Sequence, residues 1–299
     1  MTLAFSGDEV LLAHCEPRNG AKPLVTVCGS LPAPRDDVAA LARLAREMRL
    51  AEYRVSVLLG LDQYQMMVVE APGVPPEELK VAVRWRVKDM LDYHIDDATL
   101  DILTIPPGPS GGTRAQSLYV VAARNEVIAG YITRCQQAGI PLSVIDIPEM
   151  ASRNLASLVA QPGRGVAMLA FSNEGGLFTV SHEGELYLAR HLEVTLDDLA
   201  NGGVREAHFE RITLEVQRSL DYVERQFGFV AVAHLWLAPN PVAQALREHL
   251  AGNLYLPVSV LDLGEILDFS RVPELAGLEA QTRFFLPLGG SLRHEVTAL

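Results

Sequence analysis

The tetrapeptide LAFS occurs twice in this chain, at residues 3–6 and again at residues 169–172. The first copy runs LAFSGDEVLLAHC and the second LAFSNEGGLFTVS. Each is an apolar strand, a short turn of Gly with acidic or amide residues, and a second apolar strand, which is typical of a β-hairpin. A match of four residues can arise by chance between two ordinary hairpins. If it is instead a repeat, the chain is built from two similar halves.

Composition limits the class of protein. The chain has 299 residues, of which 49% are apolar and 21% charged, so it can form two globular domains, each with its own core. A net charge of −12 argues against a surface that binds nucleic acid or anionic lipid, because both need excess Lys and Arg. Three cysteines at wide spacing, Cys15, Cys28 and Cys135, form no disulfide or metal-binding pattern and suggest a reducing cytosol.

No targeting segment is recognisable. The N-terminal MTLAFSGDEV lacks a basic region and reaches Asp8 and Glu9 too early for a signal peptide. The longest apolar run, around residues 227–239, is shorter than the roughly 20 residues that a membrane-spanning helix needs. We therefore expect a soluble chain that reaches a membrane only through a partner.

Strands and helices alternate on both sides of the segment QPGRG at residues 161–165, which predicts a domain boundary there. We expect a first domain over residues 1–163 and a second over residues 164–299. The first half contains an extra strand–helix–strand–strand–helix stretch at about residues 62–140, which we expect to be an inserted subdomain. Its loop PPGPSGGT is expected to form an exposed hairpin tip.

Four segments of the chain resemble a known family in the expected order: VRWRVKDMLDYHIDDATLDI, VIDIPEMASRNLA, ITLEVQRSLDYVE and FLPLGGSLR. Together they resemble the PilM family of actin-like pilus-assembly proteins, and within it the MshI branch of mannose-sensitive pilus biogenesis. The resemblance covers nearly the whole chain. It implies an α/β fold, namely a duplicated actin/FtsA-like (ribonuclease H-like) two-domain fold with an inserted subdomain in the first half.

The chain departs from this family at the nucleotide site. In the family pattern both hairpins read Asp-hydrophobic-Gly, whereas here the aligned triplets are Ala4-Phe5-Ser6 and Ala170-Phe171-Ser172. The Asp pair would position Mg²⁺ and the attacking water, and Gly would let backbone amides approach phosphate. A third element, normally a strand followed by paired glycines, has Ala238 and Pro239 instead. The resemblance therefore implies a degenerate nucleotide site without turnover.

The residues left at this site belong to the two hairpin turns and to one helix. The degenerate phosphate loops comprise Ser6, Gly7, Ser172, Asn173, Gly175 and Gly176. The segment NEGG at residues 173–176 is open to two interpretations, a surviving anion-binding nest of backbone amides or a plain hairpin turn. Glu215 and Arg218 either line the cleft, as the resemblance implies, or form an ion pair on a helix surface. No cofactor is expected, although weak ATP binding remains compatible with these residues.

No other catalytic or metal-binding motif stands out. The eight histidines form no HExxH pattern, and no Cys/His cluster, P-loop or G-x-S-x-G motif is present, so we expect no metal site.

The resemblance also implies a partner. PilM-like proteins hold the cytoplasmic tail of a membrane-anchored, PilN-like neighbour in a groove between the inserted subdomain and the main body. The helix in EELKVAVRWRVKDMLDY is expected to bury Leu79, Val83, Val87 and Met90. Its other side carries the candidate tail-binding residues Lys80, Arg84, Trp85, Arg86 and Lys88. A basic stripe is also typical of an ordinary solvated helix face, whereas Trp and Arg are enriched at binding hot spots.

Three functions remain open at this stage. One is a non-catalytic scaffold that docks pilus components at the cytoplasmic face of the inner membrane. Another is an active actin-like ATPase whose nucleotide state switches partner binding. The third is the cytoplasmic domain of a GspL-like type II secretion protein, which shares the fold. The absence of Asp from both hairpins favours the scaffold.

Overall fold

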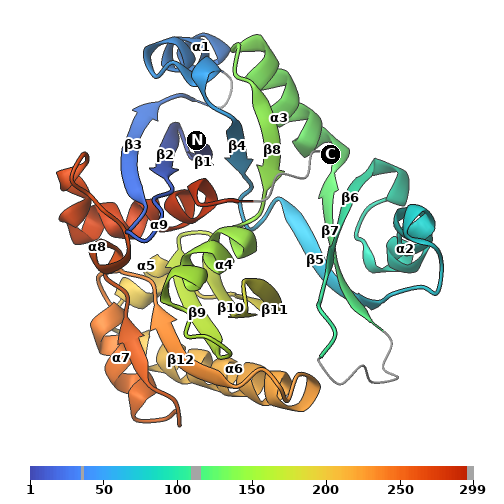
Figure 1. Cartoon of the computed structure of the whole chain (residues 1–299), viewed down its shortest axis with the longest axis vertical. Coiled ribbons are helices and arrows are strands. Elements are labelled where there is room, and N and C mark those ends of the chain that lie inside the picture. Colours follow the sequence, from blue (N-terminus) through green and yellow to red (C-terminus); the bar gives the residue numbers. More distant parts are fainter. Residues whose placement is uncertain (35–36, 109–115, 295–299) are drawn as a thin grey trace.

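The structure is a computed structural model that describes residues 1–34, 37–108 and 116–294. It contains two five-stranded sheets and one three-stranded sheet. Figure 1 shows the first five-stranded sheet at the top, the second below it, and the small sheet to one side.

The two large sheets have the same connectivity. In the first, the antiparallel strands β1 (Thr2–Ser6), β2 (Glu9–Glu16) and β3 (Leu24–Pro32) are followed by the parallel strands β4 (Val55–Leu58) and β8 (Leu142–Asp146), in the order β3-β2-β1-β4-β8. In the second, β9 (Gly165–Ser172), β10 (Gly175–His182) and β11 (Glu185–Leu192) are followed by β12 (Val232–Leu237) and β13 (Val258–Val260), in the order β11-β10-β9-β12-β13. Both LAFS copies end the first strand of a half, so the repeat corresponds to a duplication of structure.

Helices connect and cover these sheets. In the first half they are α1 (Val38–Glu47), α3 (Asn125–Gln137) and α4 (Pro148–Val159). In the second half they are α5 (Leu196–Ala200), α6 (Arg205–Gln226), α7 (Ala243–Ala251), α8 (Leu263–Ile266) and α9 (Leu278–Ser291). Local sequence fixes several ends: the Asp37 side chain caps α1 by accepting from Ala40 N, and Thr195 and Asp198 form a capping box on α5.

The last helix of each half packs on the sheet of the other half. Helix α4 follows β8 but covers β9, β10 and β11, while α9 lies at the end of the second half and packs against β1, β2 and β4. The two helices also pack against each other between the sheets (Figure 1). A Cβ atom at Gly289 would lie 2.3 Å from the Ala151 carbonyl oxygen, so only glycine allows this close helix contact. We call the α4–α9 pair, with the side chains bonded to it, the seam.

The stretch present only in the first half forms its own small unit. It comprises β5 (Tyr64–Glu70), α2 (Leu79–Val87), β6 (Ala98–Thr104) and β7 (Ser117–Arg124), with the strand order β5-β7-β6. Helix α2 covers one face of this sheet. The opposite face, with Tyr64 and Tyr119, joins the core of the main body. The expected range of about 62–140 also includes α3. This helix follows the small sheet and leads into β8 of the large sheet, as α7 leads from β12 into β13 in the second half.

One expectation for this subdomain is wrong. Val83 and Val87 of α2 are fully buried, and Leu79 is partly buried against the same cluster. Met90, however, is 51% exposed, because α2 ends at Val87 and the chain continues in a 3₁₀ turn, which moves Met90 off the buried stripe. The tip of the predicted loop between β6 and β7 lies outside the described residues.

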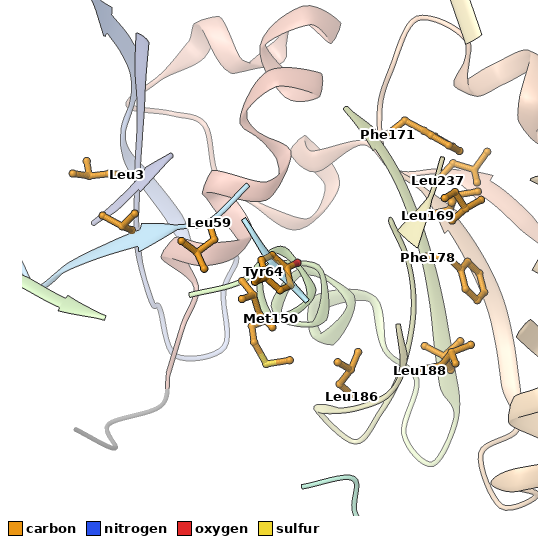
Figure 2. Close-up of a cluster of buried hydrophobic side chains, with 14 of the residues drawn as sticks. Leu3, Leu59, Tyr64, Met150, Leu169, Phe171, Phe178, Leu186, Leu188 and Leu237 are labelled. Atoms are coloured by element: carbon orange, nitrogen blue, oxygen red, sulfur yellow. The ribbon is translucent and has the colours of Figure 1, made fainter. Parts of the chain in front are cut away.

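The main core runs continuously across the halves. Figure 2 shows Leu3 and Leu59 on one side, Leu169, Phe178 and Leu188 on the other, and Tyr64 with Met150 between them. The two halves and the small sheet are therefore packed around a shared interior.

Candidate functional site

The two repeated hairpins meet at a cleft between the halves. A cavity of about 700 Å³ lies there. Its walls come from strands β1 and β9, from helix α9, and from the segments at the end of β4 and after β12. The residues that line it are Ala4, Phe5, Ser6, Leu11, Leu58, Leu59, Gly60, Leu61, Pro148, Ala170, Phe171, Ser172, Asn173, Glu174, Leu196, Ala238, Pro239, Pro241, Leu278, Glu279, Thr282, Arg283, Phe285, Leu286 and Pro287. The cavity thus occupies the place where the sequence predicted a degenerate nucleotide site.

The first hairpin contributes little that could hold a phosphate group. Ser6 lines the cavity, whereas Gly7, the other expected residue, is exposed at the turn with φ +56° and does not. Ala4, at the position of the expected carboxylate, lines the cavity with a methyl group. A methyl group neither binds Mg²⁺ nor accepts a proton.

In the second hairpin the polar groups serve the turn itself. The Ser172 hydroxyl donates to the Gly175 carbonyl at 3.3 Å and accepts from Glu174 N at 3.1 Å. Gly175 has φ +134°, and a Cβ there would lie 3.0 Å from the Leu192 carbonyl oxygen. A Cβ at Gly176 would lie 2.6 Å from the Phe171 ring. Local packing therefore explains both glycines, and neither lines the cavity, whereas Asn173 does.

One hydrogen bond crosses the cleft. The Glu174 carboxylate accepts from Leu61 N, which follows β4 of the first half, at 3.1 Å. A second lining carboxylate, Glu279, lies on α9, and the lining Arg283 forms an ion pair with Glu9. Negative side chains at the rim oppose a triphosphate in the same cleft, because like charges repel and each must be desolvated.

The third element of the predicted site, Ala238 and Pro239, has no backbone N–H group free to donate to a phosphate. Ala238 N donates to Leu169 O at 2.8 Å, inside the sheet, and Pro239 has no N–H. The Asn240 side chain accepts from Val242 N at 3.0 Å and so shapes the turn before α7. Sequence reasoning missed Asn240, although an Asn-Pro pair after a strand signals such a turn.

Glu215 and Arg218 lie away from the cleft. They form an i,i+3 ion pair on α6 at 3.0 Å, with side chains 43% and 64% exposed. Neither is among the lining residues. The structure therefore agrees with the surface-pair interpretation.

The candidate tail-binding residues lie on α2, but most of the cations already have partners. Lys80 pairs with Asp101 at 2.9 Å and Arg84 with Asp96 at 2.8 Å. Arg86 donates to the Glu70 carbonyl at 3.0 Å. Trp85 is 68% exposed, and the Lys88 ammonium lies 5.9 Å from its ring centroid.

The orientation of α2 corrects the expected groove. Among the described residues, the main contacts of helix α2 are with β5, β6 and the 3₁₀ turns on either side of it, and it lies on the face of the small sheet that is turned away from the main body (Figure 1). Its exposed side chains therefore form an outer surface rather than the wall of a groove towards the body. We define the α2 surface as Val81, Trp85 and Lys88, of which Val81 is 62% exposed.

A buried carboxylate that the sequence did not single out links three parts of the chain. Glu149, in the first turn of α4, is fully buried. It accepts from the Tyr64 hydroxyl of β5 at 2.6 Å, and His191 Nε2 of β11 lies 2.6 Å from its other oxygen. Burial, followed by the negative charge of Glu149, holds the pKa of Tyr64 well above its ordinary value. An acidic residue in the first turn of a helix is common, so nothing in the sequence distinguishes Glu149 from other such residues.

Two further features, a metal-binding cluster and a membrane-spanning helix, are absent from the described residues. Among residues 1–34, 37–108 and 116–294, no group of three or more His, Cys, Asp and Glu is placed to hold a metal ion. In the same part of the chain, no helix combines the length and apolar character needed to cross a membrane.

Comparison with known proteins identifies the fold. No protein-family model matches the chain, and no curated protein matches it. Among solved structures, it is similar to a chain of the PilM–PilN type IV pilus biogenesis complex, with a TM-score of 0.71, 21% identity and 97% of both chains covered. A Bacteroides thetaiotaomicron protein of unknown function with an actin-like ATPase fold gives a TM-score of 0.51, 10% identity and coverage of 90% and 91%. The cytoplasmic domain of EpsL, an inner-membrane component of the Vibrio cholerae type II secretion system, gives a TM-score of 0.48 at 13% identity over 95% and 92% of the chains.

The expected fold class is therefore confirmed. The chain has a two-domain actin-like fold, in which one repeated hairpin begins each half. At these identities the likeness concerns the fold, and the function rests on the site.

Proposed function

We propose that this chain is a non-catalytic scaffold of an MshI/PilM-like type IV pilus assembly machine. It docks the N-terminal cytoplasmic tail of a membrane-anchored, PilN-like protein and is thereby recruited from the cytoplasm to the inner membrane. Two features support this proposal: the similarity in fold, along the whole chain, to a protein from a PilM–PilN complex, and the nature of the cleft.

The observation that carries the proposal is the pair of alanines in the cleft. Ala4 and Ala170 line the cavity at the two positions where the resembled family has Asp. Loss of a general base alone lowers a rate by about 10²- to 10⁴-fold, and loss of the Mg²⁺ ligands adds to this. The Glu174 carboxylate also lines the cavity, and its negative charge opposes the binding of phosphate groups there. We therefore propose a pseudo-ATPase.

Isothermal titration with ATP and Mg²⁺, together with phosphate release in the steady state, tests the lack of turnover. We expect no release above a buffer blank, and weak binding without turnover would agree with the proposal. Release that is lost on mutation of a cleft residue such as Ser172 would support the active ATPase instead.

Tail docking is assigned to the candidate residues Lys80, Arg84, Trp85, Arg86 and Lys88, with the α2 surface at their centre. An exposed Trp beside a Lys can anchor an extended peptide by ring packing and charge-assisted contacts. A double variant that removes the Trp85 ring and reverses the charge of a neighbouring cation, either Arg84→Glu or Lys88→Glu, tests this assignment. Because Arg84 pairs with Asp96, Lys88→Glu is the cleaner partner for Trp85→Ala.

A pull-down with the N-terminal tail of the partner measures this interaction. We expect Trp85→Ala with Lys88→Glu to weaken it at least tenfold, about 1.4 kcal/mol, in a protein that melts like the parent. Tyr255→Ala is the matched control, because Tyr255 is an exposed aromatic residue like Trp85 but lies in the second half. Unchanged capture by the α2 variant would contradict this assignment.

A further inference from the structure

The cleft between the hairpins has the properties of a site for an apolar ligand. Its volume of about 700 Å³ lies within the range of roughly 300–1,000 Å³ that is usual for small-molecule pockets. Most of the lining side chains are Ala, Leu, Phe and Pro. Sites of this kind bind through apolar burial and use a few polar groups to orient the ligand.

Both halves contribute apolar walls. The first half provides Phe5 and Leu61, and the second provides Phe171 and Leu196. Helix α9 adds Phe285, Leu286 and Pro287. Leu278, at the start of α9, lines the cavity and is 49% exposed. The apolar lining therefore reaches solvent, where a ligand can enter.

The charges at the cavity favour one sign of ligand. Two of its three charged lining residues, Glu174 and Glu279, are negative, and the third, Arg283, is already paired with Glu9. Within the described residues Glu279 forms no ion pair, and Glu174 accepts only the Leu61 amide. A cationic group at the rim would be attracted by these carboxylates, whereas a phosphate or carboxylate would be repelled.

We propose that the cleft is a binding site for a small amphiphile with a cationic ammonium head and an apolar tail. The tail lies between the Phe5 and Phe171 walls, and the head lies at the rim beside Glu174 and Glu279. This inference does not depend on the docking of a pilus partner at α2. The proposed ligand is cationic and largely apolar, whereas the nucleotide of the resembled family is anionic and polar.

Isothermal titration with ligands of equal chain length and different heads tests the proposal. Below their micellar concentrations, decyltrimethylammonium should bind at a single saturable site at least tenfold more tightly than decanoate, with decanol between them. Each methylene removed from the ammonium series should weaken binding about fourfold if the tail is buried. ATP with Mg²⁺ should bind more weakly than decyltrimethylammonium.

Variants separate the head site from the tail site. Glu174→Gln with Glu279→Gln should reduce the preference for ammonium over decanoate to within about threefold while decanol binding is kept. Ser6→Trp or Leu278→Trp, both at partly open positions of the lining, should block all three ligands while the protein melts like the parent. Trp85→Ala is the control for adsorption to the exposed α2 surface, and it should leave the binding of all three ligands unchanged because Trp85 does not line the cleft.

Several results would overturn the proposal. These are the absence of saturable binding, binding of decanoate as tight as that of the ammonium, or binding that survives both tryptophan variants. Loss of binding in Trp85→Ala would place the ligand on α2 instead. Because peptide capture and ligand binding use different residues, failure of one proposal leaves the other unaffected.

Discussion

The same two halves meet in two ways in this molecule. At the seam, α4 and α9 are in close contact and polar groups are paired: Asn154 donates to the Gly289 carbonyl at 3.0 Å, and the Ser152 and Thr179 hydroxyls are 2.8 Å apart. At the cleft, about 700 Å³ stays open between apolar walls, and the Glu174–Leu61 hydrogen bond joins the halves. The seam is closely packed and joined by polar hydrogen bonds, whereas the cleft is a cavity with apolar walls.

This difference shows which region holds the halves together. Asp146, at the end of β8, pairs with Arg293 beyond α9 at 2.7 Å, and Glu149 joins α4 to β5 and β11. Such contacts join the two halves at the seam. None of these contacts involves a residue that lines the cleft, so the lining can differ without removing them.

Gly289→Ala should have the largest effect on the seam. The new Cβ would lie 2.3 Å from the Ala151 carbonyl oxygen, which is backbone and cannot move aside without separating α4 from α9. We expect the free energy of unfolding to fall by about 3 kcal/mol or more, as for overpacked cores. Urea unfolding measures it.

Gly130→Ala is the matched control. It makes the same change inside α3, where a Cβ would meet nothing within 4 Å. Because alanine favours a helix over glycine, this variant should gain about 0.5–1 kcal/mol. Equal destabilisation of both variants would contradict the role given to the close helix contact.

Glu149→Ala should have the next largest effect. It leaves the Tyr64 hydroxyl and His191 Nε2 at the seam without their acceptor. Unsatisfied buried donors of this kind destabilise by about 1–3 kcal/mol each, so we expect a loss of about 2–3 kcal/mol, since His191 is partly exposed. Glu215→Ala, in the exposed pair on α6, should change stability by less than about 0.5 kcal/mol. A loss of stability below 1 kcal/mol for Glu149→Ala would show that the Glu149 junction, namely Glu149 with Tyr64 and His191, does not hold the three elements together.

The sequence predicted the repeated architecture because hairpins are local. The residues of each LAFS copy pair with strands a few residues away, and the alternation of apolar residues reports that pairing. The Glu149 junction could not be predicted in this way. Tyr64 and His191 are 85 and 42 residues from Glu149, and only the packing of three elements brings them together.

The candidate sites show the same limit. That Ala4, Ser6, Ala170 and Ser172 stand at the hairpins was visible in the sequence, since it concerns residue types at fixed positions. The direction in which α2 faces was not visible, because helical periodicity separates a buried stripe from an exposed one but does not say what lies opposite. Met90 was misplaced because the helix ends at Val87, and helix ends are hard to predict to the residue.

Alkaline pH should weaken the seam through Tyr64. Below pH 10 both the folded and the unfolded states keep the phenol proton. Above it the unfolded state loses the proton, while burial and Glu149 hold the pKa of folded Tyr64 well above its ordinary value. Stability should therefore fall as pH rises above 10, by at most about 1.4 kcal/mol per pH unit from this group.

The variant Tyr64→Phe isolates this contribution. It lacks the hydrogen bond to Glu149 and should be less stable than the parent at pH 8, but the difference should shrink between pH 10 and 11. Urea unfolding at a series of pH values measures both proteins. A constant difference across this range would mean that Tyr64 titrates alike in both states.

Removal of the bond across the cleft should have the smallest effect. Glu174 is exposed, and its carboxylate accepts one amide, that of Leu61, at 3.1 Å. Because water can replace this acceptor, Glu174→Ala should lower stability by less than about 1 kcal/mol.

Hydrogen exchange with solvent at the Leu61 amide, however, should become faster in this variant. The Leu59 amide donates to the Asp146 carbonyl at 2.9 Å inside the first sheet and should keep its protection, so it is the internal control. Faster exchange at both amides would mean that the cleft bond supports the sheet as well, and that cleft and seam are not independent.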